Sequence, residues 1–87
     1  MLLVVYDISS EDVISRLRDK AKEFGEMKQI LPSSFLLDTS TDLSNVNQEF
    51  LDIVSNNGRI IISQIRRNEV NGWLSTESVN WINSKSF

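Results

Sequence analysis

The sequence opens with Leu2-Leu3-Val4-Val5-Tyr6-Asp7-Ile8-Ser9, a short apolar run bounded by a carboxylate and a serine pair. Runs of this length, rich in valine and aromatic residues, are typical of a strand that is buried on both faces. We therefore expect it to be the central strand, against which helices and later strands pack. The only chemically suggestive group in the run is Asp7, where the strand would end.

Two amphipathic helices are predicted from apolar residues that recur at three-to-four spacing. The first begins after the hydroxyl and acidic residues of Ser9–Asp12, ends at Gly25, and carries the stripe Val13, Ile14, Leu17, Ala21 and Phe24. The second has Thr41, Asp42 or Ser44 as its cap and carries the stripe Leu43, Val46, Phe50, Ile53 and Val54. Asn56-Asn57-Gly58 is expected to end it through residues that tolerate a left-handed backbone.

Three further strands are expected. Met27–Ile30 and Ser34–Asp38 flank Leu31-Pro32-Ser33, where proline favours a turn, so they should form a hairpin. Arg59–Ile65 is β-branched and nearly continuous, which predicts a second central strand with Ile61 beneath both helices. The order β-α-β-β-α-β predicts an α+β, ferredoxin-like fold with an antiparallel sheet and two helices on one face.

The remainder of the chain is predicted to be a short C-terminal appendage. We expect one domain over residues 1–87, with its core in 1–65 and the appendage in 66–87. Gly72-Trp73-Leu74 is either a short edge strand or a turn, and Ser75 or Thr76 is positioned to cap a last short helix. Trp73 and Trp81 are candidate interface residues, although they would equally serve to cover the open end of the sheet.

Composition narrows the possible functions. The chain of 87 residues has neither cysteine nor histidine, which excludes disulfides, thiolate or imidazole zinc sites and a Ser-His-Asp triad. No apolar run approaches the roughly 20 residues that span a bilayer, and no basic n-region precedes Leu2, so we expect neither membrane association nor a targeting signal. A cytoplasmic location fits these features. The net charge of −3 argues against broad non-specific binding of nucleic acid.

Asp7 is the candidate metal ligand, because a carboxylate suits Mg²⁺ or Mn²⁺ and a twofold dimer would bring in a second Asp7. On the residue alone, a strand-terminal aspartate that bonds turn amides is the preferred interpretation. The candidate phosphate-binding residues are Arg16, Lys20, Lys28, Arg66 and Arg67. Interleaved acids, such as Asp12 four residues before Arg16, favour a solvated surface for them instead.

Val4–Ser9 resembles the first strand and terminal aspartate of the CRISPR-associated protein two family, which has ribonuclease toxins and small uncharacterised bacterial and phage proteins among its relatives. Ser34–Asp38 is similar to the family's third strand, and the resemblance covers most of residues 1–65. It implies a ferredoxin-like homodimer in which Asp7 lies near the twofold axis. In active nucleases of the family that aspartate binds a divalent ion for phosphodiester hydrolysis, whereas other members bind duplex DNA without cleaving it. The hairpin around Pro32, the C-terminal region and the acidic charge depart from the family pattern.

The expected function is a small dimeric ferredoxin-fold module that associates with nucleic acid or with a protein partner. One alternative is a divalent-metal endonuclease that uses paired Asp7 carboxylates and Mg²⁺ or Mn²⁺. Another is a regulator of the phage or toxin–antitoxin type that binds protein through its sheet edge or its tryptophan surface. Whether the chain is an enzyme is left open, and the non-enzymatic interpretation is preferred.

Overall fold

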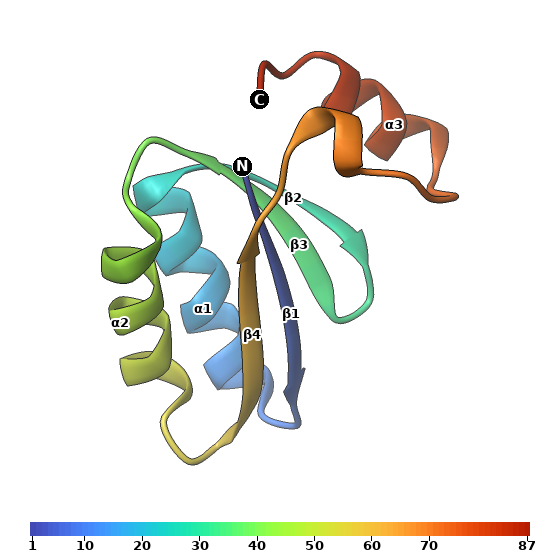
Figure 1. Ribbon diagram of the computed structural model, residues 1–87. Coiled ribbons are helices and arrows are strands. Elements are labelled where there is room, and N and C mark those ends of the chain that lie inside the picture. Colours follow the sequence, from blue (N-terminus) through green and yellow to red (C-terminus); the bar gives the residue numbers. More distant parts are fainter.

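The protein is a small α+β structure with one antiparallel sheet, which confirms the predicted class (Figure 1). The computed structural model describes residues 1–87, apart from the side chain of Asn68. Its elements are β1 (Leu2–Ile8), α1 (Glu11–Phe24), β2 (Gly25–Leu31), β3 (Ser34–Thr39), α2 (Leu43–Val54), β4 (Gly58–Gln64), the 3-10 turn η1 (Arg67–Glu69) and α3 (Thr76–Asn83).

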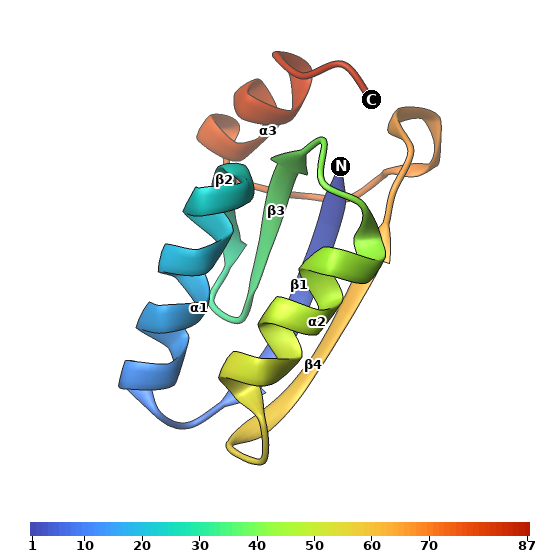
Figure 2. The same cartoon turned by 90° about the vertical axis from the view of Figure 1, so that its left-hand side faces the viewer.

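The four strands lie in the order β2-β3-β1-β4, and every neighbouring pair is antiparallel. Figure 2 shows α1 and α2 side by side on one face of the sheet. The short α3 contacts β2 from the opposite side, through the side chains of Glu26 and Lys28. The sheet therefore has one face fully covered by helices and another that only the C-terminal segment covers.

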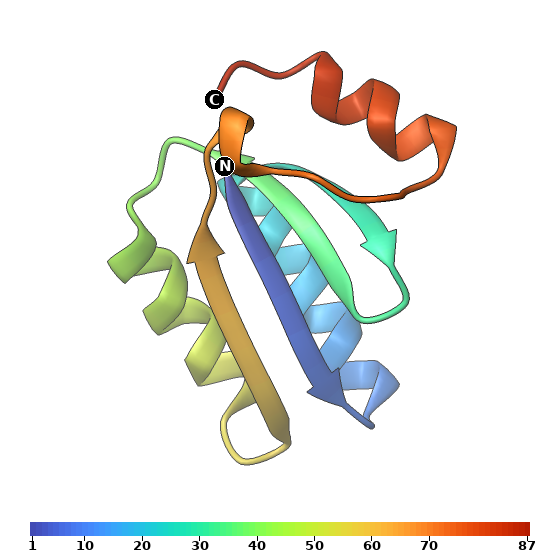
Figure 3. The same ribbon diagram turned by 45° about the vertical axis from the view of Figure 1, so that its right-hand side comes forward.

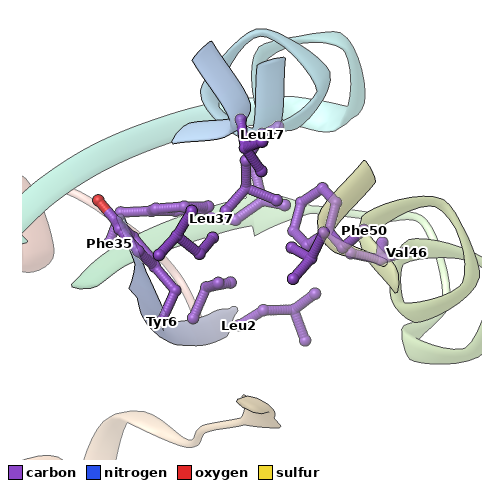
Figure 4. Close-up of a cluster of buried hydrophobic side chains, with 12 residues drawn as sticks. Leu2, Tyr6, Leu17, Phe35, Leu37, Val46 and Phe50 are labelled. Carbon is purple, nitrogen blue, oxygen red and sulfur yellow. The ribbon is translucent and has the colours of Figure 1, made fainter. Parts of the chain in front are cut away.

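The core lies between the sheet and the two long helices (Figure 4). Alternate residues of β1 point into it, because successive side chains of a strand face opposite sides. They meet aromatic rings from β3 and α2, and the ring centroids of Phe35 and Phe50 lie 6.3 Å apart in an edge-on arrangement. The buried cluster contains Leu2, Val4, Tyr6, Ile8, Val13, Leu17, Ala21, Phe35, Leu37, Val46, Phe50 and Val54.

The predicted stripe of α1 is confirmed, and that of α2 is confirmed except for Leu43, which is exposed. Each helix begins at a side-chain cap. The Ser10 hydroxyl accepts a hydrogen bond from the Val13 amide at 3.3 Å, and Asp42 accepts one from the Asn45 amide at 2.8 Å. Ser75 caps α3 in the same way. Among the residues that the structure describes, no helix combines the length and apolarity that crossing a membrane takes.

The backbone conformation at the C-terminal ends of α1 and α2 differs from the prediction. α1 passes directly into β2 at Gly25, whose φ of 168° is extended rather than left-handed. Glycine is required there by close approach, since a Cβ would lie 2.1 Å from the Asp38 carbonyl oxygen. After α2 the left-handed residue is Ser55, with φ 48°, and not one of the residues Asn56–Gly58.

The predicted hairpin is confirmed, with longer arms. β2 starts at Gly25 and β3 continues to Thr39, because the two strands remain paired to Gly25 and Thr39. A register shift between Gln29 and Leu31 marks a bulge beside the turn.

Two expectations about the apolar strands are wrong. β1 is an inner strand, but it is buried on one face only, and Val5 and Asp7 are exposed on the other. Arg59–Ile65 was expected to be central, yet β4 is an edge strand that pairs with β1 alone. Ile61 is 66% exposed, because the alternation that directs Ile60 and Ile62 toward the helices turns Ile61 away from them.

This arrangement predicts a large contrast between two substitutions. Leu37→Ala should lower the free energy of unfolding by about 2–5 kcal/mol, because it leaves a cavity in the core. Ile61→Ala, made on the exposed face, should cost about 1 kcal/mol or less. Urea denaturation in dilute solution measures both, and equal losses would contradict the placement of these side chains.

Candidate functional site

The face of the sheet turned away from α1 and α2, called the outer face below, is apolar at its centre. Leu3 and Val5 of β1 lie on it, directly opposite Leu36 of β3 and Ile61 of β4, respectively. Leu36 is only 2% exposed, whereas Ile61 is 66% exposed. The C-terminal segment therefore shields one side of this apolar surface and leaves the other open.

A groove of about 560 Å³ lies between the outer face and the C-terminal segment. Its floor is formed by Leu3, Val5 and Leu36, and its walls include Val70, Leu74 and Val79. Pockets of this size, mostly apolar with a few polar groups, are typical of ligand and peptide sites. Because residues 70–75 have no regular structure, one wall of the groove is a loop rather than a helix or strand.

The two candidate tryptophans have different environments. Trp73, in that loop, is 97% exposed at the rim of the groove. Trp81 is half-buried, and its indole Nε1 donates a hydrogen bond to Glu26 at 3.0 Å. Lys85 Nζ lies 5.0 Å from the centroid of the Trp81 ring, a cation–π distance. Trp81 therefore fastens the C-terminal segment to β2, while Trp73 points into solvent.

Polar contacts hold α3 against the sheet. Lys85 bonds to Glu26 and Lys28 bonds to Glu77, so both outward charges of β2 have a partner in the C-terminal segment. Hydrogen bonds from Lys85 and then from Trp81 lower the pKa of Glu26, and the bond from Lys28 lowers the pKa of Glu77. Exposed ion pairs of this kind contribute little stability.

Arg67 stabilises the end of α3 rather than facing a ligand. Its guanidinium donates to the Ile82 carbonyl oxygen at 2.8 Å and to Asn83 Oδ1 at 2.7 Å. These acceptors belong to the last turn of the helix, where carbonyl groups lack partners within the helix and attract a positive charge. One wall of the groove is thereby tied to the segment that follows β4.

Asp7 is exposed on the outer face, near the end of β1, and stands directly opposite Arg59 of β4. A search of the described residues finds no group of three or more His, Cys, Asp or Glu side chains that could hold a metal ion. Mg²⁺ requires several oxygen ligands in octahedral geometry, and one chain offers a single carboxylate here beside a guanidinium. A Mg²⁺ or Mn²⁺ site at Asp7 would therefore need ligands from elsewhere, such as the second Asp7 that a twofold dimer would supply.

The comparisons with known proteins were made against family models, curated proteins and solved structures. The chain matches none of them. The resemblance of residues 1–65 to the CRISPR-associated protein two family thus stays a prediction, and function has to be argued from the site itself.

The predicted basic residues lie in three places: on α1 (Arg16 and Lys20), on β2 (Lys28) and after β4 (Arg66 and Arg67). Arg16 Nε lies 3.4 Å from Asp12, which confirms the pair expected from their spacing. Lys20 Nζ lies 3.4 Å from Glu23 and 3.9 Å from Glu49. Lys28 is paired with Glu77, and Arg67 donates to the Ile82 carbonyl oxygen. The structure therefore does not bring the five predicted basic residues together into one phosphate-binding strip.

A polar cluster at the other end of the core was missed from the sequence. The Tyr6 hydroxyl accepts hydrogen bonds from Gln29 Nε2 at 3.2 Å and from Arg18 Nη2 at 3.5 Å. Arg18 Nε and Gln29 Oε1 are buried there without a partner. The sequence pattern places Arg18 on the polar side of α1. In the structure its side chain reaches the Tyr6 hydroxyl at the nearby end of the sheet. The one signal in the sequence is a tyrosine in a core strand, whose hydroxyl needs a partner.

Acid is expected to weaken the attachment of α3 to the sheet. The folded-state pKa of Glu26 lies below its ordinary value of 4.5, so its contribution is complete above pH 4.5 and is lost as the pH falls through the lowered value. In a Trp73→Phe variant, Trp81 is the sole tryptophan, and its emission should shift to the red on acidification. Adding Glu26→Gln should remove part of this pH response, with Glu77 supplying the rest, and a response that persists at full size would contradict the role of Glu26.

Asp7→Asn is expected to leave stability within about 0.5 kcal/mol of wild type, since the side chain is exposed. We also expect no Mn²⁺-dependent hydrolysis of single- or double-stranded RNA or DNA by the wild-type protein, because one carboxylate holds a divalent ion poorly. Cleavage that the wild type performs and Asp7→Asn loses would establish the metal-nuclease alternative instead.

Proposed function

We propose that the protein is a ferredoxin-like, non-enzymatic interaction module that binds a segment of a partner protein in the outer-face groove. The element order β-α-β-β-α-β and the strand order β4-β1-β3-β2 support the ferredoxin-like assignment. The groove has a volume of about 560 Å³, is lined mostly by apolar surface and is open to solvent. A mostly apolar groove of this kind suits the side chains of a partner.

The observation that carries this proposal is the exposure of Trp73. A tryptophan buries about 150–250 Å² when it is covered, so leaving it 97% exposed forgoes a large hydrophobic stabilisation. Tryptophan is also among the residues that most often dominate the binding energy of protein interfaces. Trp73 and Leu74 both line the groove, so the exposed indole adjoins the apolar surface on which a partner would pack.

Charge defines the chemistry of the partner. Arg67 lines the groove and donates to a carbonyl oxygen of α3, and Lys28 and Lys85, which hold α3 over β2, are paired with carboxylates. Glu69 lines the groove and is exposed, and the chain carries a net charge of −3. The best fit is therefore a protein segment with two or three apolar side chains next to a lysine or arginine.

The same distribution makes nucleic acid the weaker alternative. Binding to the phosphate backbone depends on lysine and arginine side chains that are available to replace counterions. Arg16 and Lys20 lie on α1 beside acids, and Lys28 is paired with Glu77. A regulator of the phage or toxin–antitoxin type would be one protein-binding module of this kind, and the groove does not distinguish among such roles.

Peptide selection with displayed random dodecamers tests the proposal. Wild-type protein should enrich apolar sequences flanked by lysine or arginine, and a synthetic copy of one should bind with a Kd that Trp73→Ala raises at least tenfold. Leu43→Ala is the matched control, because it removes an exposed apolar side chain from α2, on the other side of the sheet.

Fluorescence anisotropy measures both the peptide and a labelled DNA duplex at the same salt concentration. Equal peptide affinity for wild type and Trp73→Ala would overturn the proposal. Tighter, salt-sensitive binding of the duplex would favour the nucleic-acid alternative.

A further inference from the structure

The two edges of the sheet differ in how they are protected from other strands. β2 contains a bulge between Gln29 and Leu31, is followed by Pro32, and carries charges that hold α3. These are features that prevent edge-to-edge pairing. β4 (Gly58–Gln64) has neither bulge nor proline nor acid, its one charged residue is Arg59, and its register with β1 is unbroken over its whole length. Figure 3 shows β4 as the outermost strand on its side of the sheet.

The unpaired backbone groups of β4 can be assigned from two hydrogen bonds. The Ile65 amide donates to the Met1 carbonyl oxygen at 3.0 Å, and the Tyr6 amide donates to the Ser33 carbonyl oxygen at 3.0 Å. In antiparallel pairs, the N–H and C=O of one residue point to the same neighbour, and alternate residues point to opposite sides. The odd-numbered residues of β4 therefore bond to β1. The edge-facing residues are Gly58, Ile60, Ile62 and Gln64.

The polarity of β4 is symmetric about its centre. Gly58-Arg59-Ile60-Ile61-Ile62-Ser63-Gln64 has three isoleucines flanked on each side by two non-apolar residues. In an antiparallel pair with a second copy, centred on Ile61, Ile60 lies opposite the second copy's Ile62 and Arg59 lies opposite the second copy's Ser63. No like charges meet, and all four edge-facing residues fall in hydrogen-bonded positions. A shift of register by two residues would leave some of them without a partner.

The helix above this edge carries one exposed apolar side chain on the same side. Glu49 of α2 lies 3.9 Å from Lys20 of α1, so it marks the flank of α2 that faces α1. Leu51, two residues farther on, is about 200° around the helix and so lies on the opposite flank, toward β4. It is 47% exposed. In a pair of copies joined through β4, the two α2 helices lie on the same face and Leu51 of each approaches the other.

We propose that the protein dimerises by antiparallel pairing of β4 with β4 of a second copy, around a twofold axis beside Ile61. The sequence predicts a homodimer but not its surface, and the edge amides of β4, its symmetric polarity and Leu51 point to one. The inference does not rest on the groove. Because the groove lies over β1 and β3, the dimer carries two free grooves on one face of a continuous sheet.

This dimer has a consequence for Asp7. In this dimer, a line drawn across the strands from Asp7 passes Arg59 of the same chain, then the second copy's Ser63, and then the second copy's Leu3. The second copy's Asp7 lies four residues along β1 from that Leu3. Three strand spacings across the sheet and four residues along the strand therefore place the two Asp7 residues about 20 Å apart. Two carboxylates at that distance do not share a metal ion, so β4 pairing and a paired-Asp7 metal site exclude each other.

Single cysteines test the register directly, because the natural chain has none. Two copies of Ile61→Cys would face each other in a non-hydrogen-bonded pair, with a Cα separation of about 4.5 Å, within disulfide range. Ser63→Cys is the matched control: it is exposed on the same face of the same strand, but its two copies would lie about 14 Å apart. Mild oxidation at micromolar concentration should cross-link Ile61→Cys into a dimer at least tenfold faster than Ser63→Cys. Equal rates would overturn the proposed register.

Charge reversal tests the interface without a covalent bond. Wild-type protein should sediment at twice its mass of 10.0 kDa. Ile61→Lys and Ile61→Glu should each raise the dimer dissociation constant at least tenfold, since like charges would then oppose each other at the axis. Mixing the two variants should restore a heterodimer, and circular dichroism checks that each variant folds.

The outcomes separate this inference from the groove proposal. Monomeric wild type up to millimolar concentration, or a dimer that Ile61→Lys leaves intact, would overturn β4 pairing. A dimer broken by Val79→Lys, in the groove wall, but not by Ile61→Lys would place the interface at the groove instead. Peptide binding by Ile61→Lys should equal that of wild type, so failure of β4 pairing leaves the groove proposal standing.

Discussion

The pairing of β1 with both β3 and β4 is the constraint on which the rest of the structure depends. Hydrogen bonding on two sides makes β1 an inner strand, and strict alternation then directs Leu2, Val4 and Tyr6 beneath α1 and α2. A one-residue slip would turn this whole set toward solvent. The same alternation directs Leu3 and Val5 to the outer face. The core and the candidate binding surface are thus two sides of one strand.

The two faces of the sheet are covered unequally. α1 and α2 close the inner face with apolar stripes, whereas the outer face receives only residues 66–87. This segment contributes the short α3, held over β2 by the partners of Glu26 and Lys28, and a loop that does not fill the space beneath it. The groove and the exposed Trp73 both result from this incomplete cover, and exposed apolar surface of this kind marks interaction sites.

The proposed groove and the proposed β4 pairing use different parts of the molecule and fit together. The groove lies over β1 and β3, and the open edge lies on the far side of β4. A dimer joined at that edge would present two grooves on one face, so a partner with two suitable segments would bind more tightly than one with a single segment. Arg59 and Asp7 would remain on the outer face of each copy, beside the axis rather than on it.

The sequence by itself determined the elements whose signals are local. The spacing of Val13, Leu17 and Ala21 gave α1, the turn at Pro32 gave the hairpin, and the hydroxyl of Ser75 gave the start of α3. An apolar run does not say which of its faces will be covered or where in the sheet it will lie, because both depend on strands distant in the sequence. Only the tertiary structure placed β4 at the edge, exposed Ile61 and left β1 half-covered. It also separated the roles of Trp73 and Trp81, since a hydrogen-bond partner such as Glu26, 55 residues away from Trp81, is supplied by the fold alone.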